Sequence, residues 1–182
     1  MLRRGFLVGC MSVFSASAVA KTRHHHHKEH ESHAQHEVKK TGALVMDQHD
    51  EDILTWTVWG EARGETIEGQ KGVACVVFNR VRSRDKTFER DTGIAEACRR
   101  GSQFTFWMSR HKIHVAYDVD ELEAIRKTVR RAYREYCAGH DVTHGATFYY
   151  RRSRHLPYWA RKMRETTVLD HHEFFRPLAT GV

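Results

Sequence analysis

One glutamate in the sequence lies where an apolar helix stripe would surround it. Glu61 follows Leu54 and Val58 at helical spacing, and Trp59 is close by in the chain. A carboxyl group in such surroundings has a raised pKa, because burial disfavours its ionised form. A protonated glutamate is the usual proton donor in the cleavage of a glycosidic bond. The spacing alone leaves two interpretations open, an acid catalyst and an ion-paired structural glutamate.

Two charged neighbours of Glu61 are expected to have supporting roles. On a helix, Arg63 would point away from Glu61 and leave that carboxylate without a counter-charge. Glu65 would lie about 5–6 Å from Glu61 if the helix continued, which is near the separation of the paired carboxylates of retaining glycosidases. Gly64, however, is expected to end the helix with a left-handed turn. We therefore interpret Glu65 as a supporting or capping residue.

Polar and aromatic side chains further along the chain are candidates for sugar contacts. Gln103, Thr105 and Tyr149 carry amide and hydroxyl groups, which hydrogen-bond to N-acetyl and hydroxyl groups. Trp107 is a candidate for stacking on a sugar face, with a buried core position as the equal alternative.

Metal and thiol chemistry have weaker support in the residues. His171 and His172 are adjacent, so on a strand they would face opposite sides and make a poor metal pair. A zinc amidase would need a ligand set that the folded region does not offer convincingly. Cys75, Cys98 and Cys137 are an odd number of thiols, and a disulfide between the first two is one option. We expect no metal and no cofactor.

The elements that position these residues are predicted to be mostly helical. Asp47 is a suitable cap for a helix that carries Glu61. A second helix is predicted over about 66–82, where apolar residues on nearly all faces indicate burial. Residues 119–138 show the clearest helical period, with a capping residue before it and a glycine after it.

Short strands are predicted near the C-terminal end. Residues 146–150 and 172–175 have strand-like composition, and 157–163 are predicted to form a short helix. The fold class is therefore α+β, mostly helical, in a single domain with a few short strands. A length of 182 residues suits one domain with a short extension.

The N-terminal part of the chain differs in composition. Residues 1–20 combine two arginines, an apolar stretch and a small-residue cleavage pattern, which is typical of an export signal and resembles the twin-arginine type. Residues 21–46 hold seven of the fifteen histidines and few apolar residues, so a disordered His-rich linker is predicted. The composition of this linker favours a role as a polar spacer, and metal binding by its histidines is the alternative. The catalytic domain is assigned to 47–182.

Charge and hydropathy exclude several classes of protein. The net charge of +7 at pH 7 is modest, and no basic run is interleaved with aromatic residues, so nucleic acid is not an expected partner. A mean hydropathy of −0.65 excludes a protein with many membrane spans. After signal removal we expect no membrane association, and the sequence does not identify any protein partners.

A series of short motifs completes the pattern. They are Gly60-Glu61-Ala62-Arg63-Gly64-Glu65, Glu68-Gly69-Gln70, Val77-Phe78-Asn79-Arg80-Val81, Gln103-Phe104-Thr105-Phe106-Trp107, Gly145-Ala146-Thr147-Phe148-Tyr149, Pro157-x-Trp159-Ala160 and His172-x-Phe174-Phe175. In this order, over roughly residues 50–176, they resemble the SleB-type cell wall hydrolases, the family of the spore-cortex-lytic enzymes. In that resemblance His172 is a supporting residue.

The resemblance implies a lysozyme-like domain that cleaves peptidoglycan glycan strands between N-acetylmuramic acid and N-acetylglucosamine. Members are described as lytic transglycosylases with one catalytic glutamate, which maps onto Glu61. Such an enzyme would act outside the cytoplasm, in the periplasm or at the cell wall. Two alternatives stay open: muramidase hydrolysis of the same bond, and a periplasmic metal-binding protein that uses the His-rich tract.

Three positions depart from the family's pattern. Phe148 stands where the family often has histidine, so no catalytic or metal role is carried over to it. Asp170 replaces a usual glycine and Phe175 a usual tyrosine. No peptidoglycan-binding repeat precedes the domain in this sequence, which favours general wall remodelling over a role in the spore cortex.

Overall fold

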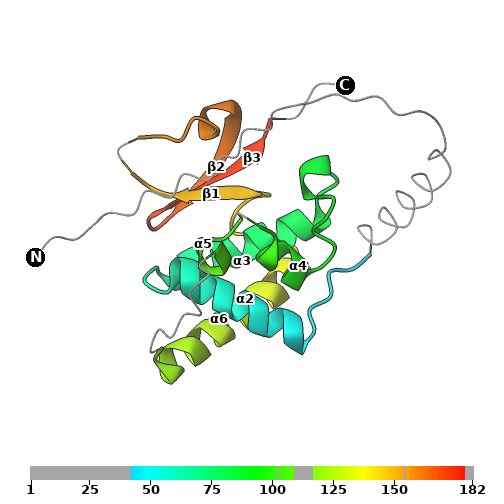
Figure 1. Ribbon diagram of the computed structural model, residues 1–182, viewed down its shortest axis with the longest axis vertical. Helices are drawn as coiled ribbons and strands as arrows, with labels where there is room; N and C mark the ends of the chain where they lie inside the picture. The colour runs from blue at the N-terminus through cyan, green and yellow to red at the C-terminus, as the bar shows by residue number, and fades with distance from the viewer. Residues whose placement is uncertain (1–41, 102, 109–116, 154, 179–182) are drawn as a thin grey trace, which may run out of the picture.

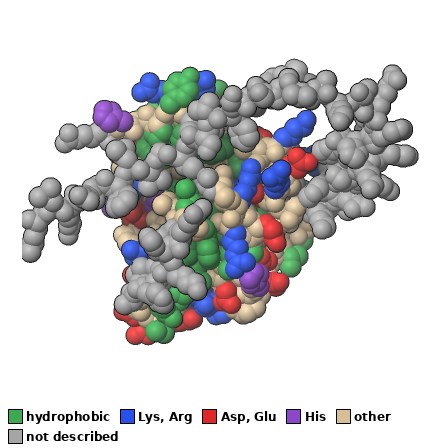
Figure 2. Space-filling view, in the orientation of Figure 1, with side chains coloured by type: hydrophobic (Ala, Val, Ile, Leu, Met, Phe, Trp, Pro, Cys, Tyr) green, Lys and Arg blue, Asp and Glu red, His purple; other side chains and the backbone are tan. Residues whose placement is uncertain are grey.

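The structure, a computed structural model, describes residues 42–101, 103–108, 117–153 and 155–178, which are the parts not drawn in grey in Figure 1 and Figure 2. Its helices form one layer and its three strands form a second layer beside them (Figure 1). The mostly helical α+β architecture predicted from the sequence is confirmed. The expected export signal and most of the His-rich linker lie outside the described residues. Within the described part, no helix is both long and apolar enough to cross a membrane.

Helix α2, Gln48–Ala62, carries the candidate acid in its last turn. It begins with a capping box, in which the Asp47 carboxylate accepts a hydrogen bond from the Asp50 amide at 2.8 Å and the Asp50 carboxylate bonds back to the Asp47 amide. The helix ends as expected before Gly64, but the left-handed turn predicted there is wrong. Among the described glycines, φ is positive at two others, 139 and 145.

Two further long helices pack against α2, and both match helices predicted from the sequence. Helix α3, Ile67–Arg82, is buried on most of its faces, because its central apolar residues are inaccessible to solvent. Helix α6, Val119–Cys137, is amphipathic and is capped by Asp118. Three short helices were not predicted: η1 (Lys86–Phe88), α4 (Ile94–Arg99) and α5 (Thr105–Met108). The three described cysteines are all free thiols, so the disulfide considered between Cys75 and Cys98 is not formed.

The sheet is antiparallel, with the order β1-β3-β2. Strands β1 (Phe148–Arg151) and β3 (His172–Pro177) match the two predicted strands. Strand β2 (Met163–Leu169) was missed, and the helix predicted over 157–163 is only the 3-10 turn η2 (Ala160–Lys162). As an edge strand β2 is polar and largely solvent-facing, so it lacks the apolar signal that marks a strand in a sequence.

A close contact fixes the sheet on α3. A Cβ atom added at Gly72 of α3 would lie 2.6 Å from Cζ of Phe174, which is too close for any side chain. Phe174 is fully buried in the central strand β3. Gly72 therefore lets the sheet approach the helix, and this approach sets the position of the neighbouring strand β1.

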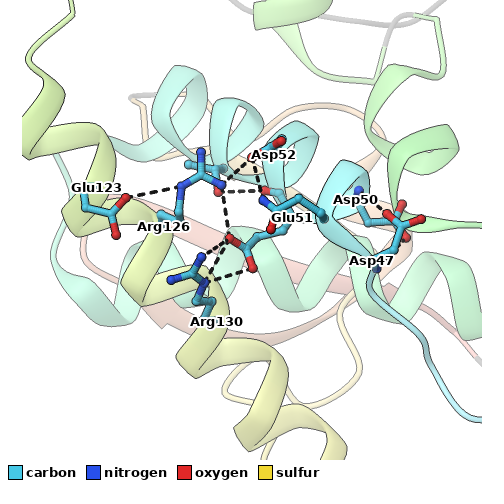
Figure 3. A network of polar contacts seen from close by, with 9 residues as sticks. Asp47, Asp50, Glu51, Asp52, Glu123, Arg126 and Arg130 are labelled. Carbon is cyan, nitrogen blue, oxygen red and sulfur yellow. Dashed lines mark hydrogen bonds and ion pairs between the residues drawn. The ribbon is translucent and has the colours of Figure 1, made fainter.

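Ion pairs hold α6 against α2 (Figure 3). The buried Glu51 of α2 accepts hydrogen bonds from Arg126 at 3.1 Å and from Nε of Arg130 at 3.0 Å. Arg126 also pairs with Asp52 and, at 3.4 Å, with Glu123 of its own helix. Burial acts to raise the pKa of Glu51, but the hydrogen bonds from the two arginines outweigh it and hold this pKa below its ordinary value.

We expect Glu51→Gln to lower the free energy of unfolding by about 1.5–3 kcal/mol at neutral pH, because it removes the charge shared by two arginines. A carboxyl with a lowered folded-state pKa stabilises the fold above its unfolded pKa, and that contribution disappears as the pH falls through the folded pKa. The difference between variant and parent should therefore shrink in acid, as measured by urea unfolding from pH 7 down to pH 2. Glu123→Gln, at a half-exposed position, should cost less than about 1 kcal/mol. Equal losses for the two variants would contradict this account.

Candidate active site

The Glu61 carboxylate lies where α2, α5 and β1 meet. One carboxylate oxygen accepts a hydrogen bond from the backbone amide of Phe106 at 3.0 Å, and the amide of Thr105 also bonds to the group. The other oxygen accepts a bond from the hydroxyl of Tyr149 at 3.3 Å. The half-buried acid is thus held by a helix start on one side and by a strand on the other.

The pKa of Glu61 is raised, chiefly because burial disfavours the ionised carboxylate. The bonds from Phe106, Tyr149 and Thr105 and the positive charge of Arg80 act in the opposite direction and only partly offset the burial. The raised pKa inferred from the apolar stripe is therefore confirmed. A carboxyl in this state can give up a proton and then be stabilised as an anion by donors that are already in place.

A glycine allows α5 to approach the acid. A Cβ atom at Gly60 would lie 2.5 Å from Cγ and Cδ2 of Phe106, so even alanine does not fit there. The Phe106 ring lies parallel to that of Trp56, with ring centres 6.2 Å apart, and edge-on to that of Trp59. These ring contacts fix the backbone amide of Phe106 beside Glu61, the residue that follows Gly60.

Tyr149 is held by aromatic neighbours. The His172 ring meets the Tyr149 ring edge-on at 5.1 Å, and Phe104 and Phe174 pack on the same ring. Burial lowers the pKa of His172, which keeps the imidazole neutral, and burial together with the Glu61 charge raises the pKa of Tyr149. The tyrosine hydroxyl therefore stays protonated and can donate to Glu61. We place His172 as the support of Tyr149.

Glu65 is placed away from the helix stripe. Its carboxylate accepts bonds from the His171 backbone amide at 3.1 Å and from the His171 ring at 2.9 Å, and it therefore ties the α2–α3 turn to the β2–β3 turn. Asp170, in the left-handed region with φ of 54°, accepts a bond from the amide of Thr66 at 2.7 Å. The usual glycine at that position of the family is explained by this backbone conformation.

The side chains of Glu65, Asp170 and His171 form the group, among the described residues, that could hold a metal ion. The ligand atoms of Glu65, Asp170 and His171 lie within 4.8 Å of one another. They already bond to each other and to backbone amides, so the arrangement serves as a link between the two turns without an ion.

The remaining predicted residues lie around the site rather than at the carboxylate. Arg63 places its guanidinium 4.4 Å over the Trp59 ring and donates to the Trp59 backbone carbonyl at 3.4 Å. Trp107 donates its indole N–H to Thr57 of α2 at 2.9 Å, which leaves its half-buried ring packed on the helix. Gln103 lies half-exposed in the turn that precedes α5.

The sequence reasoning missed two features of the site. The backbone amide of Phe106 donates a hydrogen bond to Glu61 at 3.0 Å, and the fit of Gly60 against the Phe106 ring makes that bond possible. A signal for both was present in the motif Gln103-Phe104-Thr105-Phe106, which was interpreted through its side chains alone.

Comparisons with known proteins identify the family and the fold of the chain. The family model described as Cell Wall Hydrolase matches residues 64–175, more than half of the chain, and begins three residues after Glu61. The catalytic domain of the Bacillus cereus SleB protein superposes with a TM-score of 0.58 and 24% identity, over 72% of this chain and 93% of that one. No curated protein matches the sequence.

A second solved structure is the catalytic domain of the germination-specific lytic transglycosylase SleB from Bacillus anthracis. It superposes with a TM-score of 0.57 and 25% identity, over 71% of this chain and 96% of that one. Both domains are covered almost completely, so the helical layer and the sheet are shared as one unit. With a family model that spans most of the same region, the chain belongs to the cell wall hydrolase family.

Proposed function

We propose that the protein is a peptidoglycan lytic transglycosylase that cleaves glycan strands between N-acetylmuramic acid and N-acetylglucosamine, with Glu61 as the acid and base. The observation that carries this proposal is a half-buried carboxyl of raised pKa, held by the Phe106 amide and the Tyr149 hydroxyl. Membership of the cell wall hydrolase family and the similarity to a domain described as a lytic transglycosylase support it.

In the first step, protonated Glu61 donates its proton to the glycosidic oxygen as the bond to the anomeric carbon breaks. The N-acetyl group of the sugar stabilises the positive charge that develops. The new Glu61 carboxylate is stabilised by the hydrogen bonds from Phe106 and Tyr149. It then takes the proton of the sugar's 6-hydroxyl while that oxygen attacks the anomeric carbon, which closes a 1,6-anhydro ring.

This sequence of steps needs one carboxyl group. A retaining glycosidase of the two-carboxylate type needs a second carboxylate about 5–5.5 Å from the acid. Glu65 would have had that spacing only if the helix continued, and its carboxylate is instead bonded to His171, in keeping with the supporting role expected for it. Muramidase hydrolysis, in which water replaces the 6-hydroxyl, uses the same acid and is the second candidate.

The products distinguish these reactions. Purified sacculi digested with the protein should yield muropeptides with anhydro ends, seen in mass spectra as the loss of one water relative to reducing ends. Reducing ends in place of anhydro ends would support the muramidase. Intact glycan strands with cleaved stem peptides would contradict both and indicate an amidase or peptidase.

The pH dependence of lysis tests the state of Glu61. Because the first step needs the protonated carboxyl, lysis should fall as the pH rises through the raised pKa of Glu61. Tyr149→Phe removes a hydrogen bond that favours the carboxylate, so it should move the falling limb to higher pH. Initial rates of turbidity loss between pH 4 and 9 measure both effects, and a shift of the limb to lower pH in the variant would contradict this assignment.

We also propose that residues 1–20 export the protein to the periplasm or cell wall, where its substrate lies. The support is the charge and apolar pattern of that segment and the membership of a cell wall hydrolase family. Cell fractionation of the full chain and of a chain without residues 1–20 tests this. An equal share of the two proteins in the periplasmic fraction would contradict it.

A further inference from the structure

A buried arginine lies between the two segments that hold Glu61. Arg80 of α3 is 4% exposed. Its Nε donates to the backbone carbonyl of Thr147 at 2.7 Å, at the residue directly before β1. Burial of a guanidinium costs free energy of folding unless the charge is well paired. The contacts of Arg80 therefore matter for why a charged side chain occupies this position.

Aromatic rings supply most of those surroundings. The guanidinium carbon lies 5.1 Å from the ring centre of Phe104, 5.6 Å from that of Phe88 and 5.8 Å from that of Phe148. These distances are within the range of cation–π attraction, which is strongest at desolvated sites. One guanidinium nitrogen, Nη1, has no hydrogen-bond partner among the described residues. The side chain is therefore held by rings and by the Thr147 carbonyl, and the charge of the buried Asp91 attracts it as well.

The contacts of Arg80 lead to both sets of donors on Glu61. Phe104 comes directly before Thr105 and Phe106, whose amides bond to the carboxylate. Thr147 comes two residues before Tyr149, whose hydroxyl bonds to the other oxygen. The Phe104 ring also packs on the Tyr149 ring at 6.4 Å. Arg80 is thus in contact with the lead-in to α5 and with the lead-in to β1.

We propose that Arg80 is a positioning residue for Glu61, which fixes the segments before α5 and β1 so that their donors converge on one carboxylate. The inference rests on the proposed role of Glu61. Among the described contacts, Arg80 makes no hydrogen bond to the Glu61 carboxylate itself. Its action is through Thr147 and Phe104.

The charge of Arg80 adds to this geometric role. It favours the ionised form of Glu61 and so opposes the effect of burial on the pKa of that residue. The other titratable group that bonds to the acid is Tyr149 of β1, and its hydroxyl favours the carboxylate as well. Once the proton has been donated, the charge of Arg80 therefore favours the anion in addition to its hydrogen-bond donors.

Three variants separate the positioning role of Arg80 from the effect of its charge on Glu61. Arg80→Met keeps length and apolar contact but loses the charge and the donor, and Arg80→Lys keeps the charge without the planar fork. Arg82→Met is the matched control, since it removes an exposed arginine two residues further along the same helix. We expect Arg80→Met to lower the rate of lysis by about 100-fold, because misplaced donors cost about that factor, and to raise the pKa of Glu61.

Lysine should restore the pKa of Glu61 toward the parent value but recover only part of the rate. Arg82→Met should leave both quantities unchanged. The pKa is read from the carboxyl resonance of ¹³C-labelled protein, assigned with Glu61→Gln, and it needs no lytic activity. Failure of the proposed function, seen as a folded parent without lysis, is therefore distinguishable from failure of this inference.

A folded Arg80→Met variant with an unchanged rate and an unchanged Glu61 pKa would overturn the proposal. Thermal melting and near-ultraviolet circular dichroism establish whether each variant is folded. If the methionine variant does not fold, Arg80→Lys decides the question. A folded lysine variant with the parent's rate would overturn the positioning role, and a reduced rate with an unchanged melting temperature would support it.

Discussion

Glu61→Gln is expected to lower wall lysis by about 100-fold to 10,000-fold, the range contributed by a positioned general acid. The amide has nearly the shape of the carboxyl and keeps an oxygen that can accept the bond from Phe106. Only the transferable proton and the negative charge are lost. Lysis of purified sacculi and thermal melting should be measured on the same preparations.

Stability provides an independent check on this variant. A carboxyl with a raised folded-state pKa contributes stability that is fully present below its unfolded pKa and is lost as the pH rises through the folded pKa. At neutral pH, Glu61→Gln should therefore melt at the same temperature as the parent or above it. Glu68→Gln, an exposed position in the first turn of α3, is the matched control and should keep full lysis. Lysis by Glu61→Gln within a factor of two of the parent would remove Glu61 from the mechanism.

Gly60→Ala should have the second-largest effect. Its methyl group would lie 2.5–2.6 Å from Cβ, Cγ and Cδ2 of Phe106, the root of the ring rather than a flexible end, so the backbone of α5 has to move. We expect a loss of about 1–3 kcal/mol in the free energy of unfolding, as for other overpacked sites. Because the displaced backbone carries the amide that holds Glu61, lysis should fall by about 100-fold.

Gly64→Ala is the control for that substitution, since it lies in the same motif and its added methyl group meets nothing within 4 Å. Its free energy of unfolding should stay within about 0.5 kcal/mol of the parent's, and its rate of lysis should not change. Urea unfolding and turbidity assays test both variants. If the two alanines behave alike, the close approach of α5 to α2 is not what positions the acid.

Local signals in the sequence predicted the long helices and the setting of Glu61. The apolar period of α6 and its cap Asp118 are contained within one segment, and so is the stripe of Leu54 and Val58 that leads to Glu61. Burial of that stripe raises the pKa of the acid, as expected. Features of this kind depend on residues close together in the chain.

What the sequence did not predict depends on distant or unusual contacts. The donor on Phe106 is a backbone amide 45 residues from Glu61, and side-chain spacing carries no information about it. Arg80 entered the sequence analysis only as part of a motif, and its burial depends on contacts with Phe88 of η1 and with Thr147 before β1. Strand β2 has a polar edge without apolar alternation. The left-handed backbone expected at Gly64 is not formed there. Asp170 adopts it instead, with φ of 54°, although aspartate is not the residue that signals this conformation most strongly.

The strand order has a consequence for the synthesis of the protein. Strand β3 is the last of the three in the chain but lies between the other two, so β1 and β2 have no partner until β3 has emerged from the ribosome. Tyr149 of β1 pairs with Phe174 of β3, whereas Glu61 belongs to the first helix described. A nascent or truncated chain that ends before β3 therefore contains both Glu61 and Tyr149 but lacks the strand that pairs with β1 and positions the tyrosine hydroxyl. Completion of the site is coupled to completion of the chain.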